Sequence, residues 1–290
     1  GDDNLSFGTS STAIGEANWV FEDFGIGIGV DNTADSIGSI AIGSRNTVSN
    51  FEATAIGIEN IASGLGASVF GEFSEANGTS ATALGSVAIA DADASTAVGY
   101  DAYALGLNSL AVGSFVTADG EGSIAIGSNN VASGKFSQAH GAFTTAHSAF
   151  EQVHGVGNTP YIPLSDTAWV FEDRLFVVGN GASPLSLSDA MVILKNGNTG
   201  IGTSNPAAKL HVFGQIKIDH GVAQDGYVLT SDTGGTGFWM PPATPSAIAD
   251  ADGNTQIQVE ETLNDDIIRF DIGGTEFFRM DSGRLEVLNT

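Results

Sequence analysis

Apolar and small residues repeat every 14 positions through the first half of the chain. A glycine recurs at the same position of each repeat, and we expect these glycines to be structurally required. They are Gly15, Gly29, Gly43, Gly57, Gly71, Gly85, Gly99, Gly113, Gly127, Gly141 and Gly155. The residue directly before the glycine is bulky and apolar in nine consecutive repeats: Ile14, Ile28, Ile42, Ile56, Phe70, Leu84, Val98, Val112 and Ile126. A weaker Ala-x-Gly pattern follows half a period later, as at Ala62 and Gly64. Each repeat therefore predicts two short strands and two turns.

The strand of each repeat alternates in side-chain size. In the repeat that ends at Gly43, Ile40 and Ile42 share one face of the strand, while Ser39 and Ala41 share the other. Glycine at the corner permits a positive φ or a close backbone approach, so that identical coils can stack in register. Because a coil of this length encloses little volume, we expect several chains to associate and cover the face of Ala, Ser and Gly. We expect a homotrimer, although the spacing alone does not give the number three.

Three segments make a family resemblance specific: Ser39-Ile40-Ala41-Ile42-Gly43-Ser44, Ser109-Leu110-Ala111-Val112-Gly113-Ser114 and Ser123-Ile124-Ala125-Ile126-Gly127-Ser128. They resemble the head repeats of trimeric autotransporter adhesins over about residues 11–158. The resemblance implies a trimeric, left-handed parallel β-roll that binds host, cell or abiotic surfaces. The predicted fold class is therefore all-β, a trimeric left-handed parallel β-roll (solenoid) followed by small β-rich neck and spacer modules.

The period stops near residue 159, where Pro160 and Pro163 indicate a neck rich in turns. The predicted organisation is an N-terminal segment (1–10), the β-roll (11–158), a neck (159–190), a β-rich spacer (191–245) and a C-terminal β module (246–290). Short strands are predicted at 174–179, 190–194, 209–212, 256–259, 267–272 and 275–280, with a hairpin turn at Gly273-Gly274. The stretches 194–212 and 226–232 resemble linker modules of tail-fibre-like proteins.

The charge and composition of the chain exclude some classes of binding partner. Nine Lys and Arg against 34 Asp and Glu give a formal net charge of -25, which repels nucleic acid and anionic membranes. The chain has no cysteine, so packing or subunit association must stabilise it. No apolar run approaches the roughly 20 residues that a membrane-spanning helix needs, so we expect no membrane insertion by this chain. We expect an extracellular or cell-surface location, or a place in a virion or injection-machine fibre.

Two groups of residues are candidate metal ligands, and we otherwise expect no cofactor. His140 and His154 occupy the position that earlier repeats give to bulky apolar residues, so a trimer would form rings of three imidazoles suited to a transition metal or anion. The simpler interpretation, which we prefer, is that the roll is ending and these histidines are hydrogen-bonded or hydrated. Four further residues match ligand positions of a calcium loop: Asp250, Asp252, Asn254 and Glu261. The glycine of that loop is displaced, so an acidic turn before a strand is the better interpretation.

The leading functional hypothesis is a structural and adhesive extracellular fibre, a rigid trimeric rod that presents loops for attachment to a surface or receptor. We expect no enzymatic activity, since no nucleophile or phosphate-loop motif occurs outside the repeat. One alternative is a tailspike-like fibre that degrades polysaccharide with paired carboxylates, although no pair is singled out. The other is an ice-binding solenoid, which needs an unbroken column of threonine; the best column holds only Thr12, Thr54, Thr82 and Thr96.

Overall fold

The protein is all-β. The structure, a computed structural model, describes residues 2–219, 224–242, 247–249, 255–259, 267–281 and 283–288, and these contain strands and turns but no helix. The chain divides into two compact units, Gly1–Ile216 and Lys217–Thr290. None of the described residues forms a helix long and apolar enough to cross a membrane.

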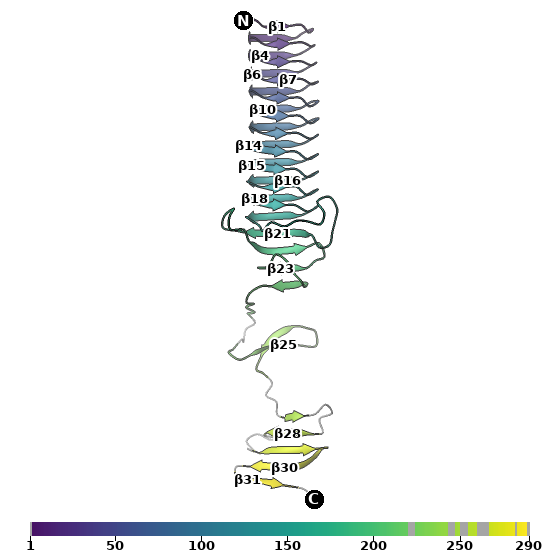
Figure 1. Cartoon of the computed structure of the whole chain (residues 1–290), viewed down its shortest axis with the longest axis vertical. Coiled ribbons are helices and arrows are strands. Elements are labelled where there is room, and N and C mark those ends of the chain that lie inside the picture. The colour runs from purple at the N-terminus through teal and green to yellow at the C-terminus, as the bar shows by residue number, and fades with distance from the viewer. Residues whose placement is uncertain are drawn as a thin grey trace. The chain divides into compact units, whose positions relative to one another are not determined.

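The first unit is a solenoid in which longer and shorter strands alternate along the chain (Figure 1). The longer strands are β2 (Thr12–Glu16), β4 (Ile26–Val30), β6 (Ile40–Ser44), β8 (Thr54–Ile58), β10 (Ser68–Glu72), β12 (Thr82–Ser86), β16 (Ile124–Ser128), β18 (Gln138–Ala142) and β20 (Gln152–Val156). The shorter ones are β1 (Leu5–Ser6), β3 (Trp19–Val20), β5 (Thr33–Ala34), β7 (Thr47–Val48), β9 (Ile61–Ala62), β11 (Glu75–Ala76), β13 (Ile89–Ala90), β17 (Val131–Ala132) and β19 (Thr145–Ala146). In two coils both parts merge into one strand, β14 (Thr96–Ala104) and β15 (Leu110–Ala118).

Successive coils pair in parallel with a constant register of 14 residues. In the pairing of β6 with β8, Ala41 lies beside Ala55 and Gly43 beside Gly57. The same register relates every neighbouring pair of longer strands from β2 to β20, so each position of the repeat becomes a straight column. The predicted β-solenoid of stacked, identical coils is therefore confirmed.

The interior of each coil is filled by small side chains. Ala41 and its equivalents from Gly27 to Val153 are buried within the single chain, whereas Ile40 and Ile42 point outward and are half-buried. Our expectation that association would cover the face of Ala, Ser and Gly is wrong, because the coil itself buries that face. The interior is narrow: its column holds at most valine, as at Val69, and an added Cβ on Gly27 would lie 2.9 Å from the Cγ2 atom of Val20 across the coil. The bulky face is the one that remains open.

The solenoid continues past the end of the 14-residue period. After an insertion, β21 (Arg174–Asn180) pairs in parallel with β20, and Gly179 lies beside Gly155 as one more coil. The sheet then reverses: β22 (Asp189–Leu194) is antiparallel to β21, and β23 (Thr199–Ile201) and β24 (Leu210–Val212) complete it. The predicted boundary at 159 thus marks the end of the strict repeat, while the compact unit extends to Ile216.

The second unit is made of antiparallel strands. β25 (Val228–Ser231) pairs with β26 (Gly237–Met240). A separate sheet contains β27 (Ala247–Ala249), β28 (Gln256–Val259), β29 (Ile268–Ile272), β30 (Thr275–Asp281) and β31 (Arg284–Val287). The predicted hairpin between β29 and β30 is present, and Gly273 and Gly274 have φ angles of 57° and 76°, as a two-residue turn of this kind requires.

Candidate functional site

The most extensive candidate site is the outward surface of the longer strands, here called the outer face. It consists of the first and third residues of each of these strands, such as Ile40 and Ile42 in β6. The third residues form an apolar column that runs from Ile14 to Ile126, whereas the first residues are Ile or Leu in some coils and Thr or Ser in others. In the single chain Ile14 is 57% and Leu84 46% exposed. An apolar strip that continues over so many coils is characteristic of a protein–protein contact.

The outer face changes character near the end of the roll. In β18 and β20 its residues are Gln138 with His140 and Gln152 with His154. The coil before them presents Ile124 and Ile126, and the coil after them presents Phe176 and Val178 in register. Two polar layers are therefore enclosed between apolar layers on the same face.

The structure stacks His140 directly on His154. Their ring centroids lie 5.0 Å apart, and the ring of His154 is 5.6 Å from that of Phe176. The Nε2 atom of His140 is buried and has no hydrogen-bond partner. Burial lowers the pKa of His140 below its ordinary value, and the charge of His154 lowers it further. At neutral pH this imidazole is therefore uncharged and has an unused lone pair or N–H.

His147, which lies seven residues from each of these histidines, is placed elsewhere. Its Nδ1 atom lies 2.8 Å from the hydroxyl oxygen of Ser133 in the preceding coil. Burial lowers the pKa of His147, with a smaller contribution from the positive charge of Arg174. The spacing of seven thus puts alternate histidines on different parts of the coil, and only His140 and His154 come together.

A ladder of buried asparagines runs along one corner of the roll, and the sequence analysis missed it. The Nδ2 group of Asn46 donates to the Oδ1 atom of Asn32 at 3.0 Å and to the carbonyl oxygens of Ile42 and Gly57 at 3.0 and 2.9 Å. The Oδ1 atom of Asn46 accepts from the next asparagine in turn. The signal in the sequence is an amide every 14 residues, at Asn4, Asn18, Asn32, Asn46 and Asn60. The ladder stabilises the stacking and is not exposed for binding.

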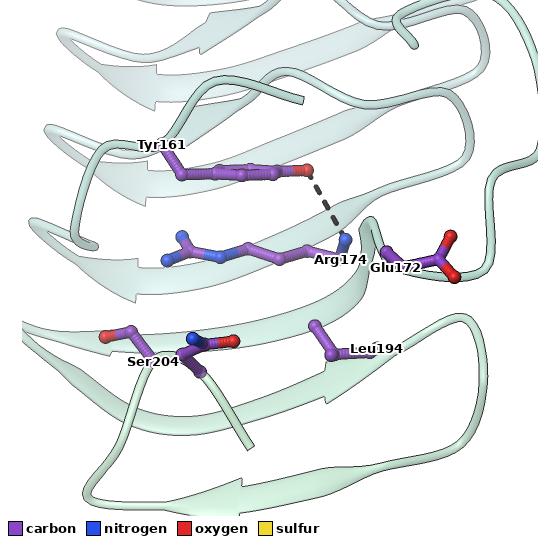
Figure 2. Close-up of a pocket in the computed structure, with 6 residues that line it drawn as sticks. Tyr161, Glu172, Arg174, Leu194 and Ser204 are labelled. Atoms are coloured by element: carbon purple, nitrogen blue, oxygen red, sulfur yellow. Dashed lines mark hydrogen bonds between the residues drawn. The ribbon is translucent and has the colours of Figure 1, made fainter. Parts of the chain in front are cut away.

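The insertion after β20 contributes to a polar network and to a pocket of about 250 Å³, which is lined by Tyr161, Glu172, Arg174, Leu194, Ser204 and Asn205 (Figure 2). The guanidinium group of Arg174 lies 4.3 Å from the ring centroid of Tyr161 and donates to the carbonyl oxygen and hydroxyl of Thr159 at 2.7 and 3.0 Å. It also forms a buried ion pair with Asp189 at 3.4 Å. Because these donors of Arg174 are already paired, the network anchors the insertion to β21 and leaves the pocket without a free charged group from this residue.

Glu151 closes the column of small residues inside the roll. It is fully buried at a position where the preceding coil has Ser137. Its Oε2 atom accepts the backbone N–H groups of His147 and Ser148, both at 2.9 Å, while Oε1 has no partner. Burial raises the pKa of Glu151, and these hydrogen bonds oppose the shift. The carboxylate caps the last regular coil and is closed to solvent.

The comparisons with known proteins identify the coils. Residues 23–46, 62–88, 90–115 and 118–146 match the YadA head domain repeat. The matched coils are similar to YadA head domain repeats and cover less than half of the chain. Among curated proteins, no sequence matches the chain. The match and the 14-residue solenoid together fit the head of a trimeric autotransporter adhesin, which is a fibre protein of the adhesin type. YadA-type heads belong to surface-exposed adhesins without enzymatic activity.

The corners of the roll present strained aromatic side chains. Every seventh residue adopts a left-handed conformation, and several of these residues are phenylalanines with φ between 53° and 63°: Phe24, Phe73, Phe115, Phe136, Phe143 and Phe150. The left-handed region is unfavourable for such side chains. Phe24 and Phe73 are nevertheless 62% and 47% exposed. Phe136, Phe150 and Trp169 form an exposed cluster with ring centroids 5.5 and 6.1 Å apart.

Metal ligands are sparse in the head. No three His, Cys, Asp or Glu residues gather within the described part of a single chain in a way that could hold an ion. The four candidate calcium ligands, Asp250, Asp252, Asn254 and Glu261, lie outside the described residues. His140 and His154 therefore remain the pair that the structure brings together.

Proposed function

We propose that this chain forms a rigid, parallel homotrimeric rod in an extracellular fibre and that the exposed corners of the rod attach it to a host, cell or abiotic surface. The rod acts by presenting its surface, without catalysis. The observation that carries this proposal is the outer face, where a column of large apolar side chains remains half-buried or exposed over nine coils while mainly alanine and valine fill the interior.

Association would bury the side chains that the single chain leaves open. Fully burying one isoleucine or leucine side chain stabilises an assembly by about 1.5–3 kcal/mol. The outer face repeats such residues through Ile14, Ile28, Ile42, Ile56, Phe70, Leu84, Val98, Val112 and Ile126. Half of that gain, summed over nine coils of one chain, is about 7–13 kcal/mol, which is comparable to the cost of about 4–15 kcal/mol for bringing partners together.

A parallel arrangement around a common axis fits the regular register. Each coil is followed by a nearly identical coil in the same direction. Chains that run side by side in the same direction therefore bring each coil against the same coil of its neighbours, so that apolar layers meet apolar layers. Closed cyclic symmetry of this kind leaves no outer face uncovered.

The corners are the parts of the rod that such an assembly leaves free. Left-handed phenylalanines are costly for stability, and strain retained at exposed positions is typical of functional sites. Phe24, Phe73, Phe136 and Phe150 are exposed at these corners, and the exposed Trp169 of the insertion contacts Phe150. Aromatic side chains are also enriched where proteins make their strongest contacts with partners. We therefore assign attachment to the corners.

Attachment can be tested by washing fluorescently labelled chain over polystyrene, glass and cultured cells. We expect the protein to be retained on at least one of these surfaces and to be displaced by excess unlabelled chain. The variant Ile42→Asp, which introduces a charge on the outer face, should lose assembly and with it at least about tenfold in retention, because multivalent contact is lost. The variant Ile37→Asp changes an exposed apolar residue in a corner of the same coil, outside the outer face, and should stay assembled, so it separates loss of assembly from a change at a corner. Wild-type protein that washes off all three surfaces as fast as serum albumin contradicts the adhesive role.

A further inference from the structure

We propose that His140 and His154 from associated chains together bind a divalent transition-metal ion of the zinc type inside the fibre. The inference rests on the proposed trimer, because one chain supplies only two adjacent imidazoles. It starts from the two polar layers on the outer face.

The polar layers form a bounded compartment. Ile124 and Ile126 precede them on the outer face, and Phe176 and Val178 follow them in register. When chains associate through this face, the histidines are enclosed between two apolar layers. Polar groups enclosed in this way need partners, because an unpaired buried donor or acceptor costs about 1–3 kcal/mol. Nε2 of His140 is already buried without a partner in the single chain.

Parallel association of three chains brings together the histidine side chains that could bind a metal ion. Three copies in register place three His140 side chains in one layer and three His154 side chains in the next, with ring centroids 5.0 Å apart within each chain. An ion between or within these layers can therefore reach three or more imidazole nitrogens. A single chain has no group of three metal-binding side chains among its described residues. Binding thus requires the assembly, and at most two ions are expected for three chains.

The imidazole ligands favour transition-metal ions over calcium and magnesium. Neutral imidazole is a preferred ligand of Zn²⁺, Ni²⁺, Cu²⁺ and Co²⁺, whereas Ca²⁺ and Mg²⁺ prefer oxygen ligands. The other polar side chains of the compartment are the amides of Gln138 and Gln152, which alternate with the histidines on the same face. An amide oxygen can accept the second ring N–H of a ligating histidine and fix its orientation. No carboxylate belongs to these two layers, so hard cations have no suitable ligands there.

The test uses the whole chain at pH 7.5, equilibrated with Zn²⁺ and passed through gel filtration, followed by elemental analysis and light scattering of the same fraction. We expect one or two zinc ions for every three chains. Replacing Zn²⁺ by Co²⁺ should give d–d absorption bands that differ from those of aqueous Co²⁺. The double variant His140→Leu/His154→Leu restores the apolar residues of earlier coils, so it should stay assembled and lose at least about 90% of the metal. His147→Ser is the matched control and should keep it.

Each outcome separates the two proposals. A trimer that retains no zinc overturns the metal site and leaves the fibre intact. Zinc retained equally by the double leucine variant also overturns it, since other groups then bind the ion. A single chain in solution overturns the trimer, and with it the shared site. A trimer whose zinc disappears only in the leucine variant supports both.

Discussion

An added methyl group on Gly57 would lie 1.9 Å from the carbonyl oxygen of Gly71, the glycine stacked beside it in the next coil. Gly57 also has a φ of 131°, which side chains rarely adopt. We therefore expect Gly57→Ala to cost more than about 4 kcal/mol of unfolding free energy, or to prevent folding. Gly66→Ala is the matched control, because Gly66 has a φ of 61° and nothing within 4 Å. It should cost only about 1–2 kcal/mol. Urea unfolding at equal chain concentration measures both, and equal losses would show that the close stacking is unimportant.

The asparagine ladder predicts a second difference. Asn46→Ala removes a buried amide and leaves partners in two neighbouring coils unpaired, so we expect a loss of about 2–4 kcal/mol. Asn50→Ala, in the same coil, removes a half-buried amide that donates to the carbonyl oxygen of Ser63 and accepts the N–H of Phe51. That variant should lose about 0.5–1.5 kcal/mol. Thermal or urea unfolding distinguishes them, and the ladder would have no role in stability if both variants unfolded together with the wild type.

We expect a corner phenylalanine to lower the stability of the fold and to increase attachment to a surface. Phe73 has a φ of 53° and is exposed, and the equivalent corner four coils later holds Asn129 at 55°. Because asparagine tolerates this conformation, Phe73→Asn should stabilise the fold by about 0.5–1 kcal/mol and reduce retention on the surface that binds the wild type. The reverse change, Asn129→Phe, should lower stability by a similar amount. Unchanged retention of Phe73→Asn would remove this corner from the attachment surface.

Acid should weaken the fold through His147. Its pKa in the folded protein lies below the ordinary value of about 6.5, so the unfolded chain binds a proton at a higher pH than the folded chain. The stability that this group contributes is therefore present above pH of about 6.5 and is lost as the pH falls through the lowered pKa. In urea unfolding between pH 7.5 and 5, we expect the wild type to lose more stability than His147→Ser. Parallel pH profiles of the two proteins would contradict this assignment.

The sequence predicted the coil but not which of its faces is inside. The column of glycines fixes the register, since each has a positive φ and a neighbour that leaves no room for a side chain. The alternation of Ala41 and Ile42 defines two faces, yet it does not say which is buried, and bulky apolar residues are normally the buried ones. Here the narrow coil reverses that rule. The largest side chain that fits inside a coil depends on the residues across the coil, and the sequence of one strand does not reveal those residues.

The end of the roll was harder to predict for a related reason. Val178 stacks on His154 although 24 positions separate them instead of 14, because the insertion of Tyr161 and its neighbours interrupts the period without interrupting the sheet. Likewise, the regular spacing of Asn18 and Asn32 is visible in the sequence. That these residues form a ladder depends on side-chain hydrogen bonds between coils, such as the one from Asn32 to Asn18. Contacts of this kind follow from stacking and become evident only once the coils are built.

The central claim is that the outer face joins three chains, and light scattering coupled to gel filtration tests it most directly. We predict that the wild type has the mass of three copies of the 29.5 kDa chain, that Ile42→Asp falls apart into single chains, and that Ile37→Asp stays assembled. A wild-type mass of 29.5 kDa at every concentration would contradict the account, because the apolar column of the outer face from Ile14 to Ile126 would then be open to water.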